Sequence, residues 1–148
     1  YEQGDLAGAI TELASMETNH PGSSYVDNAR YYLGRSYFDL QDYASAIGPF
    51  ERVLLTAGSI YIDNAHYYLG RSHYALGNLS QALTGFSTLL SNFPTSQYAD
   101  NALYYEARIY ADQTDCASAN TASTELQTKF PASPYITRSQ TYLTGAGC

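Results

Sequence analysis

A motif that occurs three times constrains the fold of this chain more than any other feature. Residues 25–38 read YVDNARYYLGRSYF, residues 61–74 read YIDNAHYYLGRSHY, and residues 98–111 read YADNALYYEARIYA. The copies begin 36 and 37 residues apart. A repeat of this length predicts a stack of similar units, each of which buries its apolar face on the next.

Each copy predicts a pair of helices, helix A and helix B. An aspartate such as Asp27 offsets the exposed N–H groups and the dipole at the start of helix A. Apolar and aromatic residues follow at helical spacing, and a short turn leads to helix B, with Ala46 and Phe50 on its buried face. Gly34 and Gly70 stand inside helix A, where glycine costs about 1 kcal/mol relative to alanine. We therefore expect helix B to approach closely there.

The order of these residues resembles the tetratricopeptide repeat (TPR) family. The likeness rests on Leu33-Gly34-x-x-Tyr37, Ala46 and Phe50, and again on Leu69-Gly70, Ala82, Phe86 and Pro94. It is most similar to TPR proteins of bacterial cell envelopes, such as the Tol–Pal-associated periplasmic protein and the outer-membrane assembly lipoproteins. The resemblance implies an all-α fold, a right-handed superhelical solenoid of antiparallel helix pairs over residues 1–148.

The repeat register also predicts the element boundaries. We expect a first helix B at 5–18, full repeats at 25–57, 61–92 and 98–129, and a terminal helix A at 133–144. The third copy departs from the pattern, because Glu106 stands where leucine is expected and Asn120 and Ser123 replace hydrophobic residues of helix B. We expect that copy to be less buried or to pack against something else.

Both ends of the predicted stack are half-repeats in the same phase. The faces left without a partner comprise Leu6, Ala9, Ile10 and Leu13 at one end, and Ile136, Tyr142 and Leu143 at the other. Since a repeat stack needs its end faces covered, we hypothesise that the terminal helix A of one subunit docks on the first helix B of the next. Such a head-to-tail interface propagates into a ring or a helical fibre, and the superhelical twist of a TPR stack favours the fibre. The alternatives are a trimmed domain or a chain that continues beyond both ends.

The two cysteines suit a disulfide. Cys116 and Cys148 are equidistant from the turn at residues 130–134, so they lie level in an antiparallel helix pair. A bridge implies an oxidising compartment. The alternative is two unrelated thiols, and neither spacing resembles a metal site.

Helix A carries a repeated polar ladder at offsets i, i+3 and i+7, which lie on one helix face. Its members are Asn28, Tyr31 and Arg35, then Asn64, Tyr67 and Arg71, then Asn101, Tyr104 and Arg108. In TPR proteins this register lines the concave groove, which implies binding of an extended peptide, an acidic tail or a glycan. The alternative is that the ladder pairs internally and stiffens the stack. We assign the adjacent Tyr32, Tyr68 and Tyr105 to the packing between helices.

Composition excludes several classes of partner. With 7 Lys+Arg against 14 Asp+Glu, the net charge of −7 argues against nucleic acid and anionic membrane surfaces. No apolar run reaches the roughly 18–20 residues that cross a bilayer, so we expect no membrane insertion. Charged residues make up only 14% and tyrosine supplies 16 residues, which is typical of an envelope or secreted protein.

No pattern indicates catalysis. The histidines, His20, His66 and His73, accompany no recognisable nucleophile, and the chain lacks phosphate-loop, HExxH and GxSxG motifs. We predict no catalytic residues, metal or cofactor. Asn78-Leu79-Ser80 is a possible glycosylation site in a turn between helices.

The leading hypothesis is a non-enzymatic structural protein, extracellular or periplasmic, whose main partner is another copy of itself. The alternative is a periplasmic or cell-envelope adaptor that binds a partner peptide in its groove.

Overall fold

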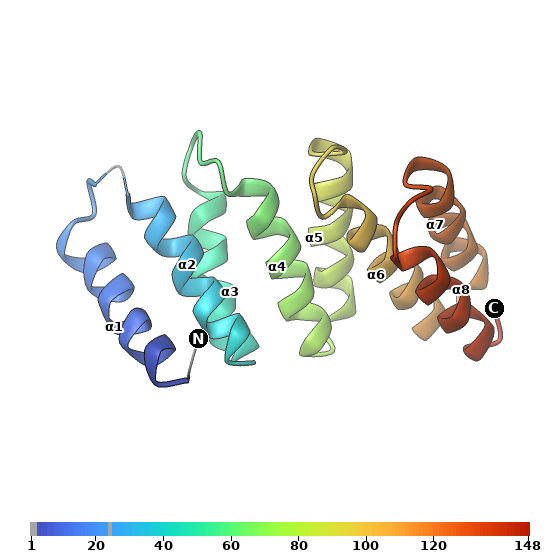
Figure 1. Ribbon diagram of the computed structural model, residues 1–148, viewed down its shortest axis with the longest axis horizontal. Helices are drawn as coiled ribbons and strands as arrows, with labels where there is room; N and C mark the ends of the chain where they lie inside the picture. Colours follow the sequence, from blue (N-terminus) through green and yellow to red (C-terminus); the bar gives the residue numbers. More distant parts are fainter. Residues whose placement is uncertain (1–2, 24) are drawn as a thin grey trace. The chain divides into compact units, whose positions relative to one another are not determined.

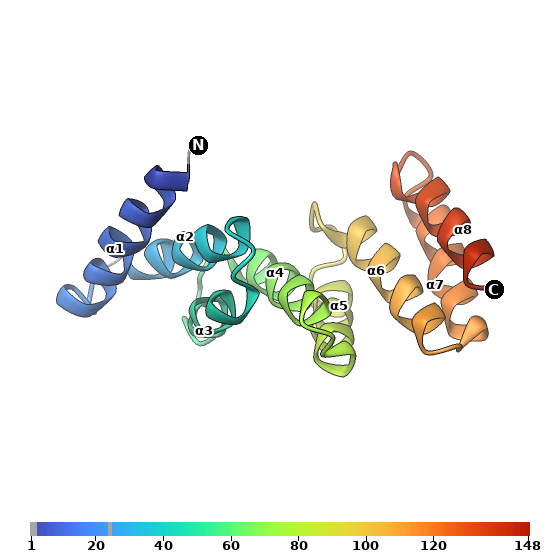
Figure 2. The ribbon, with the colours of Figure 1, turned by 90° about the horizontal axis from the view of Figure 1, so that it is seen from below.

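The chain is an all-α repeat protein. The computed structural model describes residues 3–23 and 25–148, with side chains described from Ala7 onward, and no strand occurs among them. The helices are α1 (Gln3–Asn19), α2 (Val26–Asp39), α3 (Tyr43–Leu54), α4 (Ile62–Ala75), α5 (Leu79–Asn92), α6 (Ala99–Asp112), α7 (Cys116–Lys129) and α8 (Tyr135–Gly145) (Figures 1 and 2).

The helices alternate as the repeat register predicts. The A helices are α2, α4, α6 and α8, and the B helices are α1, α3, α5 and α7. The first B helix, expected at 5–18, spans Gln3–Asn19, and the terminal A helix, expected at 133–144, spans Tyr135–Gly145. In the part of the chain described, no helix is both long enough and apolar enough to cross a membrane.

The helices form two compact units, residues 1–82 and 83–148, with the boundary inside α5. In the first unit α1 packs on α2, α2 on α3, and α3 on α4. In the second unit α6 packs on α7, and α8 packs on both. Each unit therefore joins A and B helices from more than one repeat.

The core of the first unit is centred on α3. Phe50 and Val53 are fully buried, and the Phe50 ring stacks on Tyr68 of α4 with centroids 5.6 Å apart. A Cβ atom at Gly34 would lie only 2.8 Å from the Phe50 ring. The expected close approach of helix B to the mid-helix glycine is thus confirmed at Gly34.

The core of the second unit uses smaller side chains. Ala107, Ala119 and Leu143 belong to one buried cluster that joins α6, α7 and α8. Beside it, Phe86 of α5 stacks on Tyr105 of α6 with centroids 5.4 Å apart. Alanine in place of the mid-helix glycine keeps the helices of this unit close together.

Polar residues replace apolar ones inside the third repeat and are paired there. Ser123 is buried and its hydroxyl accepts a hydrogen bond from Ser139 of α8 at 2.9 Å. Glu106 is buried too, and its carboxylate accepts a bond from Ser87 of α5 at 2.6 Å. Asn120 is exposed and donates to the carbonyl oxygen of Cys116. This repeat packs against its neighbours through hydrogen bonds as well as apolar contacts.

A serine precedes each A helix and forms a hydrogen-bonded turn at its entrance, a feature that the sequence analysis missed. In every copy the hydroxyl oxygen accepts a bond from the backbone N–H of the tyrosine two residues later. The pairs are Ser23 and Tyr25 at 3.2 Å, Ser59 and Tyr61 at 3.2 Å, Ser96 and Tyr98 at 3.3 Å, and Ser133 and Tyr135 at 3.1 Å. The aspartates lie in the first turn of the helix, as expected.

The turns from A to B helices share one backbone conformation. Gln41, Gly77 and Thr114 have φ angles of 62°, 77° and 61°, in the left-handed region. The residue after Gln41, Asp42, accepts a bond from the backbone N–H of Ser45 and so caps α3. Only the second copy supplies the glycine that this conformation favours.

One assignment to the core was wrong. Tyr32 is 48% exposed, because its ring meets the rings of Tyr31 and Tyr61 edge-on at the surface and is not enclosed between helices. Tyr68 is buried as expected, between Phe38 and Phe50, and Tyr105 is half-buried.

Candidate binding surface on the A helices

The asparagine and tyrosine of the ladder tie neighbouring A helices together in the first unit. Asn28 of α2 donates to the hydroxyl of Tyr61 at 2.8 Å, and Asn64 of α4 donates to the hydroxyl of Tyr31 at 3.2 Å. The rings of Tyr31 and Tyr61 stack with centroids 4.5 Å apart and planes 10° from parallel. These residues therefore stiffen the helix pair.

The arginine of each ladder is braced by the tyrosine one turn earlier. Arg35, Arg71 and Arg108 donate to the hydroxyls of Tyr31, Tyr67 and Tyr104 at 3.3, 2.8 and 3.3 Å. Arg35 also lies 4.3 Å above the Tyr68 ring, and Arg108 lies 4.4 Å above the Tyr142 ring. We call the surface that carries the ladders of α2 and α4 the A-helix face of the first unit, and the surface that carries the ladder of α6 the A-helix face of the second.

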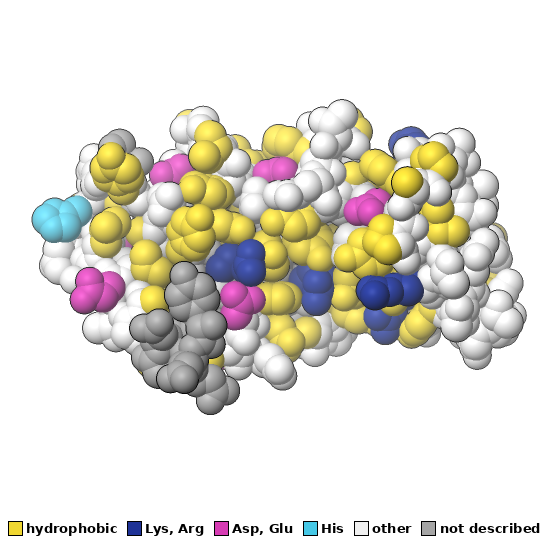
Figure 3. All heavy atoms as spheres, viewed as in Figure 1, with side chains coloured by type: hydrophobic (Ala, Val, Ile, Leu, Met, Phe, Trp, Pro, Cys, Tyr) yellow, Lys and Arg dark blue, Asp and Glu magenta, His cyan; other side chains and the backbone are white. Residues whose placement is uncertain are grey.

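The arginine side chains of the A-helix face lie against aromatic rings. Figure 3 shows Lys and Arg side chains surrounded by hydrophobic ones over α2 and α4 of the first unit, and again over α6 of the second. Burial acts to lower the pKa of Arg35, but the hydrogen bond to Tyr31 and the nearby Tyr68 and Asp39 outweigh it, so that the pKa is raised. Arg35 stays cationic while its side chain remains 30% exposed.

The second unit repeats part of this arrangement. Tyr104 stacks on Tyr135 of α8 with centroids 5.5 Å apart, and Asp100 accepts a bond from the Ser133 hydroxyl at 2.7 Å. Asn101 is buried. The tyrosine that opens one A helix thus covers the ladder tyrosine of the preceding A helix in both units.

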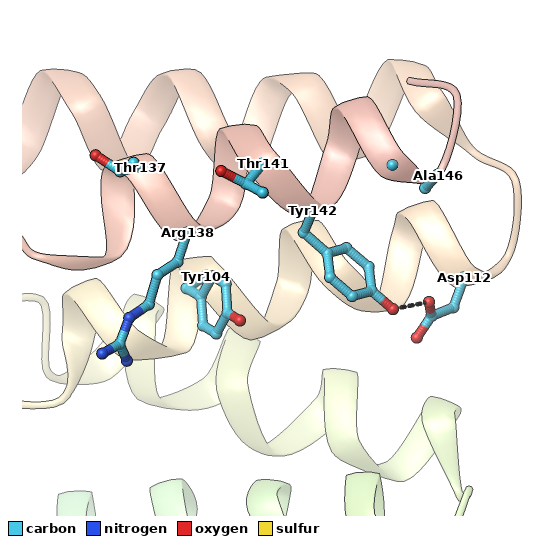
Figure 4. Close-up of a pocket in the computed structure, with 8 residues that line it drawn as sticks. Tyr104, Asp112, Thr137, Arg138, Thr141, Tyr142 and Ala146 are labelled. Carbon is cyan, nitrogen blue, oxygen red and sulfur yellow. Dashed lines mark hydrogen bonds between the residues drawn. The ribbon is translucent and has the colours of Figure 1, made fainter.

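A shallow, open pocket of about 700 Å³ lies between α6 and α8 (Figure 4). Its lining residues are Tyr104, Asp112, Thr137, Arg138, Thr141, Tyr142, Gly145 and Ala146. Figure 4 shows Arg138 and Tyr142 projecting from α8 toward α6 on either side of Tyr104, with the Tyr142 hydroxyl donating to Asp112. The sequence analysis did not predict this pocket.

The pocket exists because α8 breaks the ladder. In the repeat register Arg138 takes the asparagine position, Thr141 the tyrosine position and Gly145 the arginine position. α8 therefore lacks an aromatic ring at the tyrosine position of the ladder and a guanidinium at the arginine position. This substitution is visible in the sequence once α8 is aligned with the three copies.

The end faces proposed for self-assembly have different environments. On α1, Leu6 lies outside the described side chains, whereas Ala9, Ile10 and Leu13 are half-buried. On α8, Ile136 and Tyr142 are half-buried. Leu143 was expected to be unpartnered, but it is 4% exposed because it packs into the alanine cluster of its own unit.

The predicted disulfide is confirmed. Cys116 and Cys148 are bonded, with Cα atoms 5.1 Å apart. The bridge joins the first residue of α7 to the chain just after α8, and Cys148 packs beside the alanine cluster. The helix α8 is therefore tied to α7 at both ends, by the connecting turn at its start and by the disulfide just after its end.

The histidines and Asn78 are the remaining residues that the sequence analysis singled out. His66 and His73 lie on α4, and burial lowers the pKa of each despite the nearby carboxylates of Asp63 and Glu51. His20 is exposed after α1, and Asn78 is exposed in the turn between α4 and α5. Within the described residues, no group of three His, Cys, Asp or Glu side chains is arranged to hold a metal ion.

An ion-pair cluster that the sequence analysis missed joins the first three helices. Glu17 of α1 pairs with Arg30 of α2 at 2.9 Å and with Arg52 of α3 at 2.7 Å. Arg30 also donates to the Thr56 hydroxyl at 3.0 Å. No local pattern links Glu17 to either arginine, because the pairs form across separate helices.

The paired helices, their register and the ladder define a TPR-type helical repeat protein. The chain belongs to the YfiO outer membrane lipoprotein family, whose model matches residues 1–109. No curated protein matches the sequence.

Solved structures with similar folds are also of the TPR type. MamA has a TM-score of 0.75 and 17% identity, over 97% of this chain and 84% of MamA. PcrH from Pseudomonas aeruginosa has a TM-score of 0.71 and 16% identity, over 85% of this chain and 95% of PcrH. A chain of the CopN–Scc3 complex has a TM-score of 0.68 and 19% identity, over 86% of this chain and 73% of that chain. At these identities the likeness concerns the fold alone.

Proposed function

We propose that this chain is a non-enzymatic scaffold whose A-helix face binds an extended segment of a partner protein. The observation that carries the proposal is the bracing of Arg35, Arg71 and Arg108, each held by a tyrosine hydroxyl on its own helix. The same device recurs at each copy of the repeat.

Bracing prepares an arginine for binding. A side chain that is already ordered loses less conformational entropy on association, and this loss is about 0.5–1.5 kcal/mol for each immobilised long side chain. The planar guanidinium fork offers several donors to carbonyl or carboxylate oxygens. The two interpretations of the ladder are therefore compatible, since its asparagines and tyrosines stiffen the stack while its arginines present donors.

Membership of an outer membrane lipoprotein family supports a partner in the bacterial envelope. The Cys116–Cys148 disulfide fits an oxidising compartment such as the periplasm. The extracellular location remains a prediction without support of its own.

Self-assembly into a fibre has less support. Leu143, the central residue of the proposed C-terminal face, is used inside its own unit and is not available to a neighbour. Covering that face with a second copy would bury little more of this side chain. The adaptor function, which depends on the A-helix face, is therefore favoured over the structural one.

A display library of random dodecapeptides tests the proposal on the full, disulfide-bonded chain. We expect selection of peptides whose binding weakens in Arg35→Gln and Arg71→Gln but not in Lys129→Gln, which changes an exposed cation on α7. Circular dichroism verifies that each variant keeps its helicity. If no peptide is enriched, or if all three variants bind equally, the proposal is wrong.

A further inference from the structure

The last A helix differs from the others in charge as well as in shape. In the first turn of α2, α4 and α6 the repeat register places an aspartate, but in α8 it places Thr137. The next position changes from asparagine to Arg138. The start of α8 has thus lost a carboxylate and gained a cation, at the helix end whose dipole already favours anions.

Among the described residues, no carboxylate pairs with Arg138. Elsewhere Arg30 and Arg52 pair with Glu17, Arg35 pairs with Asp39, and Lys129 pairs with Glu125. In the described part of the chain Arg138 is exposed and forms no ion pair, and its guanidinium lies 5.4 Å above the Tyr135 ring. An unpaired arginine is notable in a chain with twice as many acidic as basic residues.

Two hydroxyls beside Arg138 are also available. The threonines on the exposed faces of other helices, such as Thr121 and Thr128, donate to the carbonyl four residues earlier. Among the described hydrogen bonds, Thr137 and Thr141 make none. Both line the pocket between α6 and α8, one helical turn apart.

We propose that the pocket between α6 and α8 binds a carboxylate side chain within an extended acidic segment of a partner protein, with Arg138 as the counter-ion. This inference rests on the proposed function and names the chemistry of one subsite on that surface. Arg138 supplies the fork that matches a carboxylate, and the Thr137 and Thr141 hydroxyls bond to the backbone of the segment. The Tyr104 and Tyr142 rings provide rigid contact area.

The opposite end of the pocket restricts the sequence of the bound segment further. Asp112 of α6 lies there, bonded to Tyr142, which follows Arg138 by one helical turn on α8. The segment therefore carries an acidic residue at the Arg138 end and none at the Asp112 end, where the Asp112 carboxylate would repel it.

The test uses the peptides selected by the wild-type chain, each made in matched forms with glutamate or glutamine at the acidic position. We expect Arg138→Gln to weaken binding of the glutamate form about tenfold or more, because a charge-assisted hydrogen bond is lost. The glutamine form should bind the wild type and Arg138→Gln equally. Arg138→Lys should bind the glutamate form more tightly than Arg138→Gln does. Lys129→Gln, the control, should bind it as tightly as the wild type.

Failure of this subsite is distinct from failure of the scaffold. If the selected peptides lack acidic residues, or if Arg138→Gln binds every peptide as the wild type does, the subsite is overturned while peptide binding stands. If no peptide binds the wild type, the proposed function itself fails. Phosphatidylglycerol vesicles are the second probe. Vesicle binding that depends on Arg138 while peptide binding does not would overturn the assignment to a peptide.

Discussion

Gly34 of α2 lies directly against the ring of Phe50 in α3, so that a Cβ atom at Gly34 would come within 2.8 Å of Cε1. Phe50 is fully buried and stacks on Tyr68, so its ring cannot simply move aside. A single absent methyl group thus sets how closely an A helix and its B helix pack.

We expect Gly34→Ala to destabilise the chain, although alanine favours the helix by about 1 kcal/mol. Overpacking a filled core costs about 1–3 kcal/mol, which outweighs that gain. Urea denaturation measures the difference. Gly8→Ala in α1 is the matched control, since nothing lies within 4 Å of a Cβ there, and it should stabilise the helix. Equal effects from both substitutions would contradict the close packing.

Glu106 predicts how stability depends on pH. Burial raises the pKa of this carboxyl and Glu125 raises it further, although the hydrogen bond from Ser87 opposes them. The folded state therefore holds the proton more tightly than the unfolded chain does. The free energy of unfolding should fall as pH rises from the usual glutamate range through the raised pKa of Glu106.

Glu106→Gln should remove this contribution and make the chain more stable than the wild type at pH 7. Thermal unfolding between pH 4 and pH 7.5 measures the effect. Glu12→Gln, on the exposed side of α1, should leave the slope unchanged. If the stability of Glu106→Gln falls with rising pH as steeply as that of the wild type, the buried carboxyl does not cause the pH dependence.

The left-handed turn residues predict a gain in stability. Thr114 is β-branched and has a φ of 61°, a conformation that Gly77 adopts without a side chain in the equivalent turn. Thr114→Gly should stabilise the second unit by roughly 0.5–1 kcal/mol, as the relief of strain exceeds the entropic cost of glycine. The reciprocal change, Gly77→Thr, should lower the urea midpoint, and a rise would refute the interpretation.

The disulfide should stabilise the second unit more than the first. Cys116 and Cys148 are 32 residues apart, and closing a loop of that size contributes about 3–4 kcal/mol. We expect a reductant to lower the midpoint for loss of α8, followed by hydrogen exchange, while amides of α2 and α3 keep their protection. The double variant Cys116→Ser/Cys148→Ser serves as the control, because its unfolding should not respond to reductant at all.

Much of the fold follows from the sequence because the repeat is strict. The mid-helix position of Gly34 predicts a close approach of helix B, which the Phe50 ring makes. The equal spacing of Cys116 and Cys148 from a turn predicts their bridge. The serine two residues before each repeated tyrosine is equally periodic, and the sequence could have revealed that turn too.

The binding surface was less accessible from the sequence. Tyr31 and Tyr32 are neighbours with similar propensities, but Tyr31 is buried against the rings of Phe50, Tyr61 and Tyr68, which lie far from it in the sequence. The pocket beside Arg138 results from what α8 lacks, and a missing ring is not apparent until the helices are superimposed on the repeat. Glu17 pairs with two arginines on other helices, which no local pattern encodes.

The central claim is that the A-helix face binds an extended partner segment. A titration of the ¹⁵N-labelled, disulfide-bonded chain with a selected acidic peptide, followed by NMR, tests it most directly. We predict chemical-shift changes on the A-helix face of at least one unit, at Arg35 and Arg71 in the first or at Arg138, Thr141 and Tyr142 in the second. Changes confined to the outer face of α7, at Thr121 and Thr128, or to Leu13 of α1 would contradict it.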